Sequence, residues 1–254
     1  MSSILKKEFI FGFHAIDALL KSHPEKICRL YRQEGRDDKR MQAILQLADA
    51  QAIPIQSVSK QQCDIWANAG VHQGVLAEIK AVSKQFNERD LFNLLTQRLQ
   101  DETRPPFLLV LDEVQDPHNL GACLRSANAA GVDAVIIPQD RSASMSATVR
   151  KIAAGAAETT PLFSVTNLAS TLDKLKKAGI WCYGLDQCAT QSIYATALTG
   201  ALALVLGAEG KGLRRLTKER CDALIAIPML GTVNSLNVSV AAGICLFEAL
   251  RQRQ

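Results

Sequence analysis

The chain has 254 residues, of which 48% are hydrophobic and 21% are charged, and its formal net charge is +4. This length accommodates one large domain or two modest ones, each able to bury a core. No apolar run approaches the ~18 residues of a membrane span, and the N-terminus lacks a small-residue cleavage site, so we expect a cytoplasmic protein without a membrane partner. The charges of both signs are spread along the chain, which permits a polyanionic partner without arguing for one.

Residues 1–80 are predicted to form a small α/β domain. FGFHAIDALL has apolar residues at helical spacing, ICRLYR reads as a strand, MQAILQLADAQ as a helix, and IPIQSVS and GVLAEIKAV as further strands. The fragment GRDDKR places Arg36, Lys39 and Arg40 beside a glycine. These cations either hold phosphates or form an ordinary solvated charge run.

Residues 81–104 are predicted to be a flexible linker. The stretch is polar around one amphipathic turn of leucines, and residues 101–106, with two prolines at the end, break any helix. A linker of this length lets the first domain move relative to the second.

From Phe107 onward, strands alternate with helices, which predicts an α/β catalytic domain with a parallel sheet over residues 105–254. The predicted strands are FLLVLD, AVIIP, PLFSV, WCYGL, LALVLG and LIAIP. The helices are expected at residues 120–130, 147–153, 168–178, 214–220 and 236–251.

Two of these strands run into polar loops. Residues 202–206 lead directly to three glycines, Gly207, Gly210 and Gly212, which leave backbone groups open to a ligand. Residues 223–227 lead to a second loop that we expect to close at Asn234 or Ser235, either of which would cap the last helix. Ligands of open parallel sheets bind outside the carboxyl ends of strands, so both loops are expected at one site.

Three segments carry a resemblance: LDEVQDPHNLGACLRSANAAGVDAVIIP, LVLGAEGKGL and IPMLGTVNSLNVSVAAGICLFEALRQR. They resemble the three motifs of the SpoU/TrmH branch of the SPOUT RNA ribose methyltransferases, from about Phe107 to the C-terminus. The resemblance implies a deep C-terminal trefoil knot, S-adenosylmethionine as cofactor, and a homodimer. GRDDKR and VHQGV are similar to a ribosomal-protein-like RNA-binding domain of family members that methylate the 2′-hydroxyl of a guanosine in 23S rRNA. The implied partner is therefore 23S rRNA or the assembling large ribosomal subunit.

The resemblance also assigns a catalytic set, which consists of Asn119, Arg125, Glu209, Ser235 and Asn237. Arg125 lies off the apolar stripe of its helix, and a side chain whose pKa exceeds about 12 is a poor base, so we interpret it as a phosphate clamp that stabilises a developing alkoxide. Asn119 alternatively caps its helix, and one residue of the pair Ser235 and Asn237 alternatively caps the last helix. The cofactor is expected to contact Gly207, Ile227 and Leu236.

Six further basic residues are candidate phosphate contacts because they follow strand ends or flank the glycines: Arg141, Arg150, Lys151, Lys211, Arg214 and Arg215. Each is alternatively a plain solvated charge. The chain departs from the family at Glu113, a position where glycine is usual, and this puts the shape of the local loop in question.

Other readings compete with this one. The same chemistry on tRNA shares all three motifs, and a non-catalytic assembly factor would keep the fold but not the whole catalytic set. A dehydrogenase is disfavoured because GAEGKG is not GxGxxG and follows a late strand. Seven cysteines without a CxxC pair favour reduced core thiols, so no metal site is expected.

Overall fold

The computed structural model describes residues 8–67, 70–79, 86–101 and 104–254. The chain divides into two compact units, which we describe separately: residues 1–84 with 146–159, and residues 85–145 with 160–254. Among the described residues, no helix is long and apolar enough to cross a membrane.

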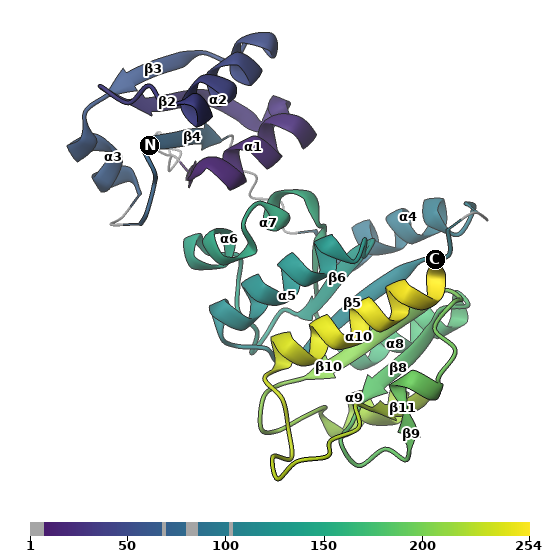
Figure 1. Cartoon of the computed structure of the whole chain (residues 1–254). Coiled ribbons are helices and arrows are strands. Elements are labelled where there is room, and N and C mark those ends of the chain that lie inside the picture. Colours follow the sequence, from purple (N-terminus) through teal and green to yellow (C-terminus); the bar gives the residue numbers. More distant parts are fainter. Residues whose placement is uncertain (1–7, 68–69, 80–85, 102–103) are drawn as a thin grey trace, which may run out of the picture. The chain divides into compact units, whose positions relative to one another are not determined.

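The first unit is built on a four-stranded sheet with the order β1-β4-β2-β3, in which only β2 and β3 are parallel (Figure 1). The strands are β1 (Glu8–Phe11), β2 (Ile27–Gln33), β3 (Ile55–Val58) and β4 (Val75–Ile79). Helices α1 (Phe13–Ser22) and α2 (Lys39–Ala50) bury an apolar stripe on one face, and α3 (Lys60–Trp66) packs on the other. A short 3-10 helix, η1 (Pro24–Lys26), precedes β2, and the unit also includes α6 (Ala147–Ala153) and α7 (Ala156–Thr159).

The expected elements of this unit are confirmed over the described residues, and β1 and α3 are among the elements that were not predicted. Phe11, the first residue of the predicted helix, belongs to β1, because Gly12 with φ +92° separates this strand from α1. The segment KQQCDIW forms α3, whose cap Ser59 accepts a hydrogen bond from the backbone N–H of Gln62. Both elements were too short for a periodic pattern to reveal them.

The second unit is a parallel sheet of seven strands in the order β7-β6-β5-β10-β8-β11-β9. The strands are β5 (Phe107–Asp112), β6 (Ala134–Pro138), β7 (Leu162–Val165), β8 (Trp181–Leu185), β9 (Gln191–Ser192), β10 (Leu202–Gly207) and β11 (Ala223–Ala226). The helices are α4 (Glu88–Arg98), α5 (Pro117–Ala129), α8 (Leu168–Lys177), α9 (Arg215–Arg220) and α10 (Val238–Arg253), with a 3-10 turn η2 (Ile193–Ala195). The predicted α/β architecture with a parallel sheet is confirmed; the trefoil knot stays a prediction.

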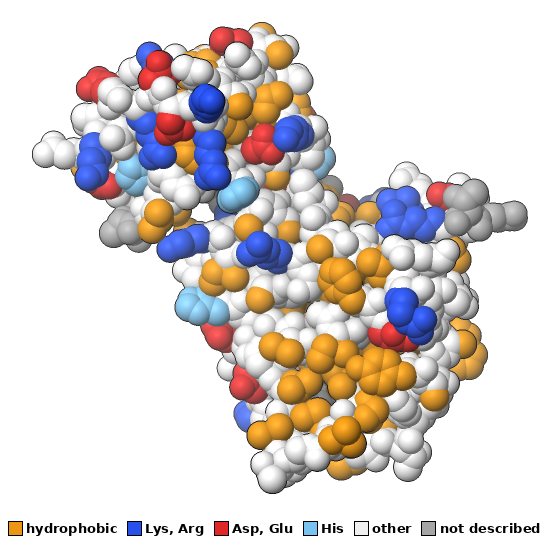
Figure 2. Space-filling model, viewed as in Figure 1, with side chains coloured by type: hydrophobic (Ala, Val, Ile, Leu, Met, Phe, Trp, Pro, Cys, Tyr) orange, Lys and Arg blue, Asp and Glu red, His pale blue; other side chains and the backbone are white. Residues whose placement is uncertain are grey.

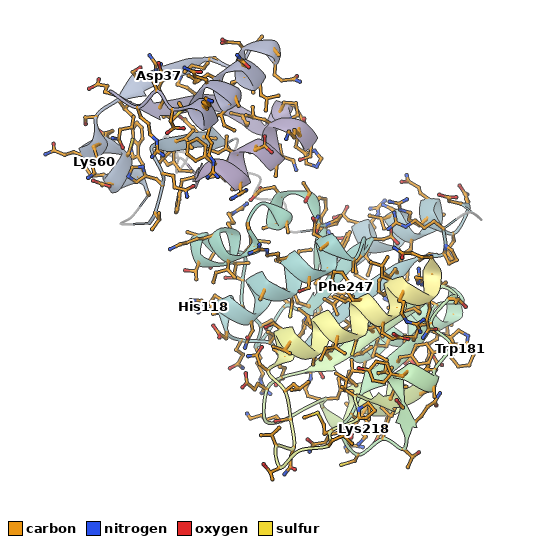
Figure 3. The ribbon with its side chains drawn as sticks, viewed as in Figure 1. Asp37, Lys60, His118, Trp181, Lys218 and Phe247 are labelled. Carbon is orange, nitrogen blue, oxygen red and sulfur yellow. The ribbon has the colours of Figure 1, made fainter. Side chains whose placement is uncertain are left out.

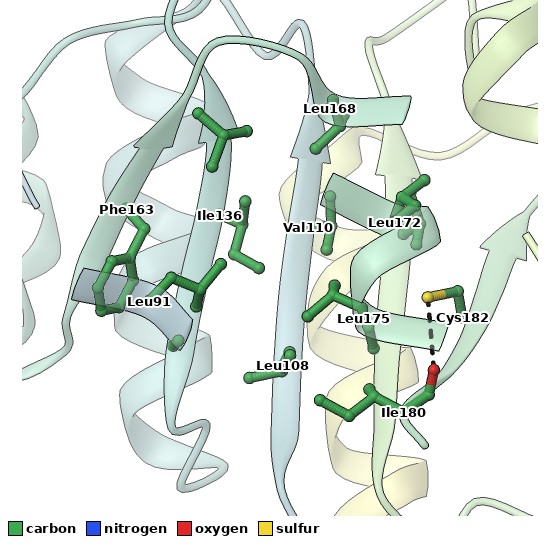
Figure 4. Close-up of a cluster of buried hydrophobic side chains, with 14 of the residues drawn as sticks. Leu91, Leu108, Val110, Ile136, Phe163, Leu168, Leu172, Leu175, Ile180 and Cys182 are labelled. Carbon is green, nitrogen blue, oxygen red and sulfur yellow. Dashed lines mark hydrogen bonds between the residues drawn. The ribbon is translucent and has the colours of Figure 1, made fainter. Parts of the chain in front are cut away.

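The core of this unit explains why its strands read as continuous apolar runs. Helices α5 and α10 lie together against one face of the sheet (Figure 1). Figure 4 shows the other face, where Leu91 of α4 and Leu172 of α8 pack on Val110 and Ile136 of the central strands. A strand covered on both faces has no solvated side, so every residue of β5 is buried.

Helix α4 lies within residues 81–104, the stretch that the sequence predicted as a flexible linker. Its Leu91 and Leu95 are buried in the core of the second unit, and Asn87 with Asp90 forms a capping box at its start. The amphipathic turn noted in the sequence is therefore a complete helix that belongs to the second unit.

Candidate active site

A pocket of about 530 Å³ opens at the carboxyl ends of β8, β10 and β11. The expected cofactor contacts Gly207, Ile227 and Leu236 all line it, and so do Glu209 and Ser235. The two loops predicted from the strand ends thus meet at one site, at the edge where ligands of parallel sheets bind.

The glycine loop, which we define as residues 208–213, forms one wall of this pocket. A Cβ on Gly207 would lie 2.0 Å from the carbonyl carbon of Gly212, so no other residue fits where β10 ends. Gly210 and Gly212 have φ of +77° and +65°, and the Gly212 N–H donates to the carbonyl of Ala208 at 2.8 Å. The three glycines are required because the loop turns tightly back on its own strand.

Three of the five predicted catalytic residues form an amide–carboxylate cluster. Asn237 Nδ2 donates to Asn119 Oδ1 at 2.9 Å and to Glu209 Oε2 at 3.2 Å, and Asn119 Nδ2 lies 3.5 Å from the same Glu209 oxygen. These side chains come from the first turn of α5, the glycine loop and the cap of α10. The fold therefore brings together three segments that lie far apart in the sequence.

The helix caps decide between the alternatives for the two asparagines. Asp116 caps α5 through the backbone N–H of His118 at 2.9 Å, so Asn119 is not a cap. Asn237 caps α10 by accepting from the backbone N–H of Ser239 at 2.9 Å and also belongs to the cluster. The prediction that α10 begins at Leu236, with Asn234 or Ser235 as its cap, is wrong, because the second loop runs two to three residues further before this cap.

The other two predicted catalytic residues lie on the surface of the second unit. Arg125 is exposed on α5, off the buried stripe that contains Leu120 and Leu124. Within the described part of the chain, its guanidinium has no hydrogen-bond or ion-pair partner. Ser235 is exposed where the second loop lines the pocket. Both side chains are accessible to a ligand, but within the described residues no hydrogen bond or ion pair joins either of them to the cluster.

The predicted phosphate contacts of the second unit differ in how far they are engaged. Arg214 contacts the buried carboxylate of Asp112 through Nε at 2.7 Å, whereas Lys211 is exposed on the glycine loop. Arg215 pairs with Glu219 one helical turn away at 2.7 Å, with its own side chain 78% exposed. Arg141 pairs with Glu113 at 3.4 Å and is 72% exposed. Lys211, Arg141 and Arg215 are thus open to solvent.

The backbone conformation at Glu113 explains why glycine is usual at this position in the family. Its φ is +60°, the left-handed region that glycine adopts without a steric penalty. Its carboxylate lies 3.3 Å from Arg214 Nη1 as well as 3.4 Å from Arg141 Nη1. The loop therefore keeps the backbone conformation typical of glycine and adds an acidic side chain between two arginines.

In the first unit, the two sequence fragments GRDDKR and VHQGV lie side by side. The backbone N–H of Gln33 donates to the carbonyl of Gly74 at 2.8 Å, and a Cβ on Gly74 would lie 2.7 Å from Arg36 Cδ. Arg36 also pairs with Asp38 at 2.9 Å, and this hydrogen bond lowers the pKa of the Asp38 carboxyl. Arg36 is therefore partly engaged by the fold.

Lys39 and Arg40 are exposed in the first turn of α2, directly after the cap Asp38. Cations at a helix N-terminus oppose the helix dipole, so these two side chains do not stabilise α2. Among the basic residues of segment 146–159, Lys151 is exposed, whereas Arg150 pairs with Glu158 at 2.6 Å and is only 19% exposed. Lys39, Arg40 and Lys151 thus remain accessible.

An ion pair at the pocket was not anticipated from the sequence. Asp186, directly after β8, and Lys218 of α9 both line the pocket, and their charged atoms are 2.5 Å apart. The hydrogen bond from Lys218 lowers the pKa of Asp186. The sequence has the same feature here as at the glycine loop, namely polar residues immediately after a buried strand. The prediction of the pocket used this feature for β10 and β11 but not for β8.

Most of the cysteines are buried, whereas Cys28 and Cys188 are exposed. All seven lie among the described residues and are free thiols, and burial raises the pKa of Cys123, Cys221 and Cys245 to about 12. Among the described residues, no three His, Cys, Asp or Glu side chains are grouped as metal ligands.

Comparison with known proteins agrees with this geometry. The family model described as "SpoU rRNA Methylase family" matches residues 106–247, more than half of the chain. The chain belongs to the SpoU rRNA methylase family. A second model, "RNA 2'-O ribose methyltransferase substrate binding", matches residues 9–85. The resemblance read from the three motifs is therefore confirmed.

The relatives match over almost their full length. The 23S rRNA (guanosine-2'-O-)-methyltransferase RlmB of Pectobacterium atrosepticum is 53% identical over 97% of this chain and 98% of its own. RlmB of Escherichia coli K12 is 52% identical over 97% of this chain and 99% of its own. A solved RNA 2'-O ribose methyltransferase superposes with a TM-score of 0.74 at 25% identity, over 98% of this chain and 89% of that one. The AdoMet complex of the SpoU methyltransferase AviRb from Streptomyces viridochromogenes shares the fold, with a TM-score of 0.74 at 21% identity and 97% and 90% coverage.

Proposed function

We propose that the protein transfers a methyl group from S-adenosylmethionine to the 2′-hydroxyl of a guanosine ribose in 23S rRNA. The observation that carries the proposal is the similarity of the whole chain, including the substrate-binding segment, to 23S rRNA (guanosine-2'-O-)-methyltransferases. The first unit, rather than the catalytic motifs, favours rRNA over tRNA, since those motifs occur in enzymes of both kinds.

The pocket fits the cofactor. Its volume of about 530 Å³ lies within the usual range for small-molecule sites, and its walls combine bare glycine backbone with the apolar side chains Ile227 and Leu236. Backbone groups of the glycine loop can hydrogen-bond the polar parts of the cofactor, and the apolar side chains can enclose its adenine. When bound, S-adenosylmethionine supplies an electrophilic methyl group on a sulfonium.

The chain's own residues then have to orient the ribose and stabilise the charge that develops on it. Methylation would replace the hydroxyl proton of the 2′-oxygen by the methyl group, with the proton passing to solvent and S-adenosylhomocysteine as the leaving group. The cluster of Asn119, Glu209 and Asn237 fixes the segments around the pocket, with Glu209 as acceptor for both amides. Ser235, on the pocket wall, contacts the substrate beside it.

Arg125 acts on the RNA as a clamp. Its planar guanidinium can hold a phosphate in two hydrogen bonds and stabilise the alkoxide, and a guanidinium has donors but no acceptor for a proton, so it is not the base. Its exposure and its lack of a partner among the described residues support this role, since nothing has to be broken before the RNA binds.

The first unit supplies sequence-independent attraction for the RNA backbone through Arg36, Lys39 and Arg40. Phosphate contacts fix the register of a nucleic acid without reading its bases. Lys151, Arg141, Lys211 and Arg215 are proposed as further contacts, in the cytoplasm, where ribosomal subunits assemble.

We further propose that the protein is a homodimer that pairs through α10. Figure 2 shows hydrophobic side chains gathered over this helix, where Val240 and Phe247 are each 49% exposed. Phe247 points outward from α10 (Figure 3). Ala242 is buried and a Cβ on Gly243 would lie 3.9 Å from Ser126 Oγ of α5, so the proposed pairing surface consists of the large exposed side chains. Light scattering should give a dimer mass at micromolar concentration; a monomer would contradict the proposal.

The decisive experiment maps ribose methylation over the RNA of cells with and without the gene. One guanosine of 23S rRNA should lose its 2′-O-methyl group on deletion and regain it when the wild-type gene, but not the Arg125→Ala gene, is restored. Unchanged rRNA together with a tRNA that loses a methyl group would refute the rRNA assignment.

A further inference from the structure

We infer that Asp112 is a positioning residue that fixes both ends of the glycine loop and thereby the wall of the pocket. The inference rests on the proposed function for the ligand of that pocket. It assigns a role to a residue that lines no part of the pocket and belongs to none of the sets predicted from the sequence.

Asp112 meets the start of the glycine loop through its backbone. It is the last residue of β5 and pairs in register with Gly207, the last residue of β10. Its carboxylate meets the end of the loop at Arg214. The Arg214 backbone N–H donates to Oδ2 at 3.1 Å, Nε donates to Oδ1 at 2.7 Å, and Nη2 lies 2.6 Å from Oδ1. One residue therefore bridges the two ends of the loop.

Because Asp112 is buried, its contact with Arg214 differs from a surface ion pair, whose partners readily exchange each other for water. The Asp112 side chain is 0% exposed, whereas that of Arg214 is 42% exposed. A carboxylate at that depth needs a charged partner, because an unpaired buried charge carries a large desolvation penalty. The contact through Nε and Nη2 together with the backbone N–H is charge-assisted and directional, so it holds orientation as well as distance.

The glycine loop needs such a bridge because its sequence does not stiffen it. Gly210 and Gly212 adopt positive φ, and glycine loses more conformational freedom on ordering than any other residue. Yet this loop carries Glu209 into the amide–carboxylate cluster and lines the pocket throughout. Holding both of its ends reduces the entropy that the cofactor would otherwise have to remove on binding.

The same contacts give Arg214 a structural task in place of the predicted phosphate contact. Its Nε and Nη2 face Asp112, and its Nη1 lies 3.3 Å from Glu113. RNA could bind this guanidinium only by leaving the buried Asp112 carboxylate without its charged partner. The neighbouring cations Lys211, Arg141 and Arg215 are exposed and remain available to phosphate.

The test is Asp112→Asn in the full-length chain, which keeps the shape and one carbonyl acceptor but removes the charge. We expect the Kd for S-adenosylhomocysteine, measured by calorimetry, to rise at least about tenfold, with the Kd for an rRNA fragment unchanged. Amide exchange of Gly212, whose N–H bonds Ala208 within the loop, should accelerate by at least about tenfold in the absence of any ligand. Arg214→Lys, which keeps the charge and loses the planar fork, should shift both quantities in the same direction but less.

The matched control is Glu88→Gln, which breaks the 2.6 Å ion pair with Lys174 in the same unit, outside the loop and the pocket. It should lower the melting temperature without changing cofactor affinity or Gly212 exchange. Wild-type affinity and exchange in Asp112→Asn would overturn the inference, and so would an equal loss of affinity in Glu88→Gln. If the wild-type protein binds no S-adenosylhomocysteine, the proposed function fails, and the exchange data alone decide whether Asp112 fixes the loop.

Discussion

The two units use charged side chains in different ways. In the first unit, the side chains of Arg36 and Asp38 form a pair with 35% and 45% exposure, and the neighbouring cations Lys39 and Arg40 are open to solvent. In the second unit, the carboxylates at the end of β5 are covered, since the Asp112 side chain is 0% and that of Glu113 is 12% exposed. An exposed ion pair contributes only about 0–1 kcal/mol, whereas a buried one holds its partners in place.

The difference suits two tasks. An exposed cation can replace a carboxylate partner by an RNA phosphate at little cost in free energy, so the first unit can bind RNA without fixing its orientation. Covered carboxylates order the backbone around the pocket, and methyl transfer depends on such fixed geometry. RNA binding by the first unit and methyl transfer at the pocket of the second unit should therefore be separable by mutation.

Arg125→Ala should abolish turnover and leave the fold intact. The residue is exposed and off the buried stripe of α5, so its removal should change stability by less than about 0.5 kcal/mol. Loss of the charge that stabilises the alkoxide should lower kcat by about 10³-fold. A methyl-transfer assay at saturating RNA, together with a thermal melt, measures both quantities.

Arg125→Lys is the control, since it keeps the charge but has no planar fork, and we expect poor rescue. Near-normal methylation by the alanine variant would remove Arg125 from the mechanism and place the charge stabilisation elsewhere.

Residues 86–254, which keep only segment 146–159 of the first unit, should bind S-adenosylmethionine. Their rRNA methylation should be about 10²-fold weaker than that of the whole chain, because the positioning supplied by residues 1–84 is missing. The shorter fragment 105–254 lacks α4, whose Leu91 and Leu95 are 0% and 1% exposed. Its loss should destabilise the fragment by several kcal/mol, in the range of about 2–5 kcal/mol for each leucine removed from a core. Urea denaturation and calorimetry on both fragments measure these effects. Full rRNA activity of residues 86–254 would refute a substrate role for the first unit.

Much of this architecture was readable from the sequence, because buried parallel strands and amphipathic helices impose clear periods. The pocket edge followed from the apolar run of residues 202–206 and its glycines. What could not be read was pairing across the fold. Arg214 looked like a free cation because its partner Asp112 lies 102 residues away in the chain, and Asn237 looked like one of several possible caps. The catalytic roles came from the resemblance, since no spacing rule assigns them.

Replacing both Lys39 and Arg40 with alanine should weaken RNA binding and spare chemistry. Each lost phosphate contact should reduce the slope of log Kd against log salt by about 1, and together they should raise Kd about tenfold. The kcat at saturating RNA should be unchanged, and α2 should lose no stability because the two cations oppose its dipole. Filter binding of an rRNA fragment across a salt series measures the effect. Lys21→Ala, which removes an exposed cation paired with Asp17, is the matched control, and an equal effect there would mean that net charge alone is responsible.

The smallest predicted effect concerns Glu113, where the second unit places an acidic side chain at positive φ. Glu113→Ala removes the carboxylate but keeps a Cβ at φ +60°, whereas Glu113→Gly removes both. The glycine variant should be more stable than the alanine variant by about 0.5–1 kcal/mol, because relief of the left-handed strain exceeds the greater entropy that glycine gains on unfolding. The free energy of unfolding of the glycine variant should differ from that of the wild type by less than about 1 kcal/mol, since the lost partner Arg141 is 72% exposed and Arg214 retains its contact with Asp112. Urea denaturation of the three proteins gives these differences. An alanine variant as stable as the glycine variant would show that the backbone at this position is not strained.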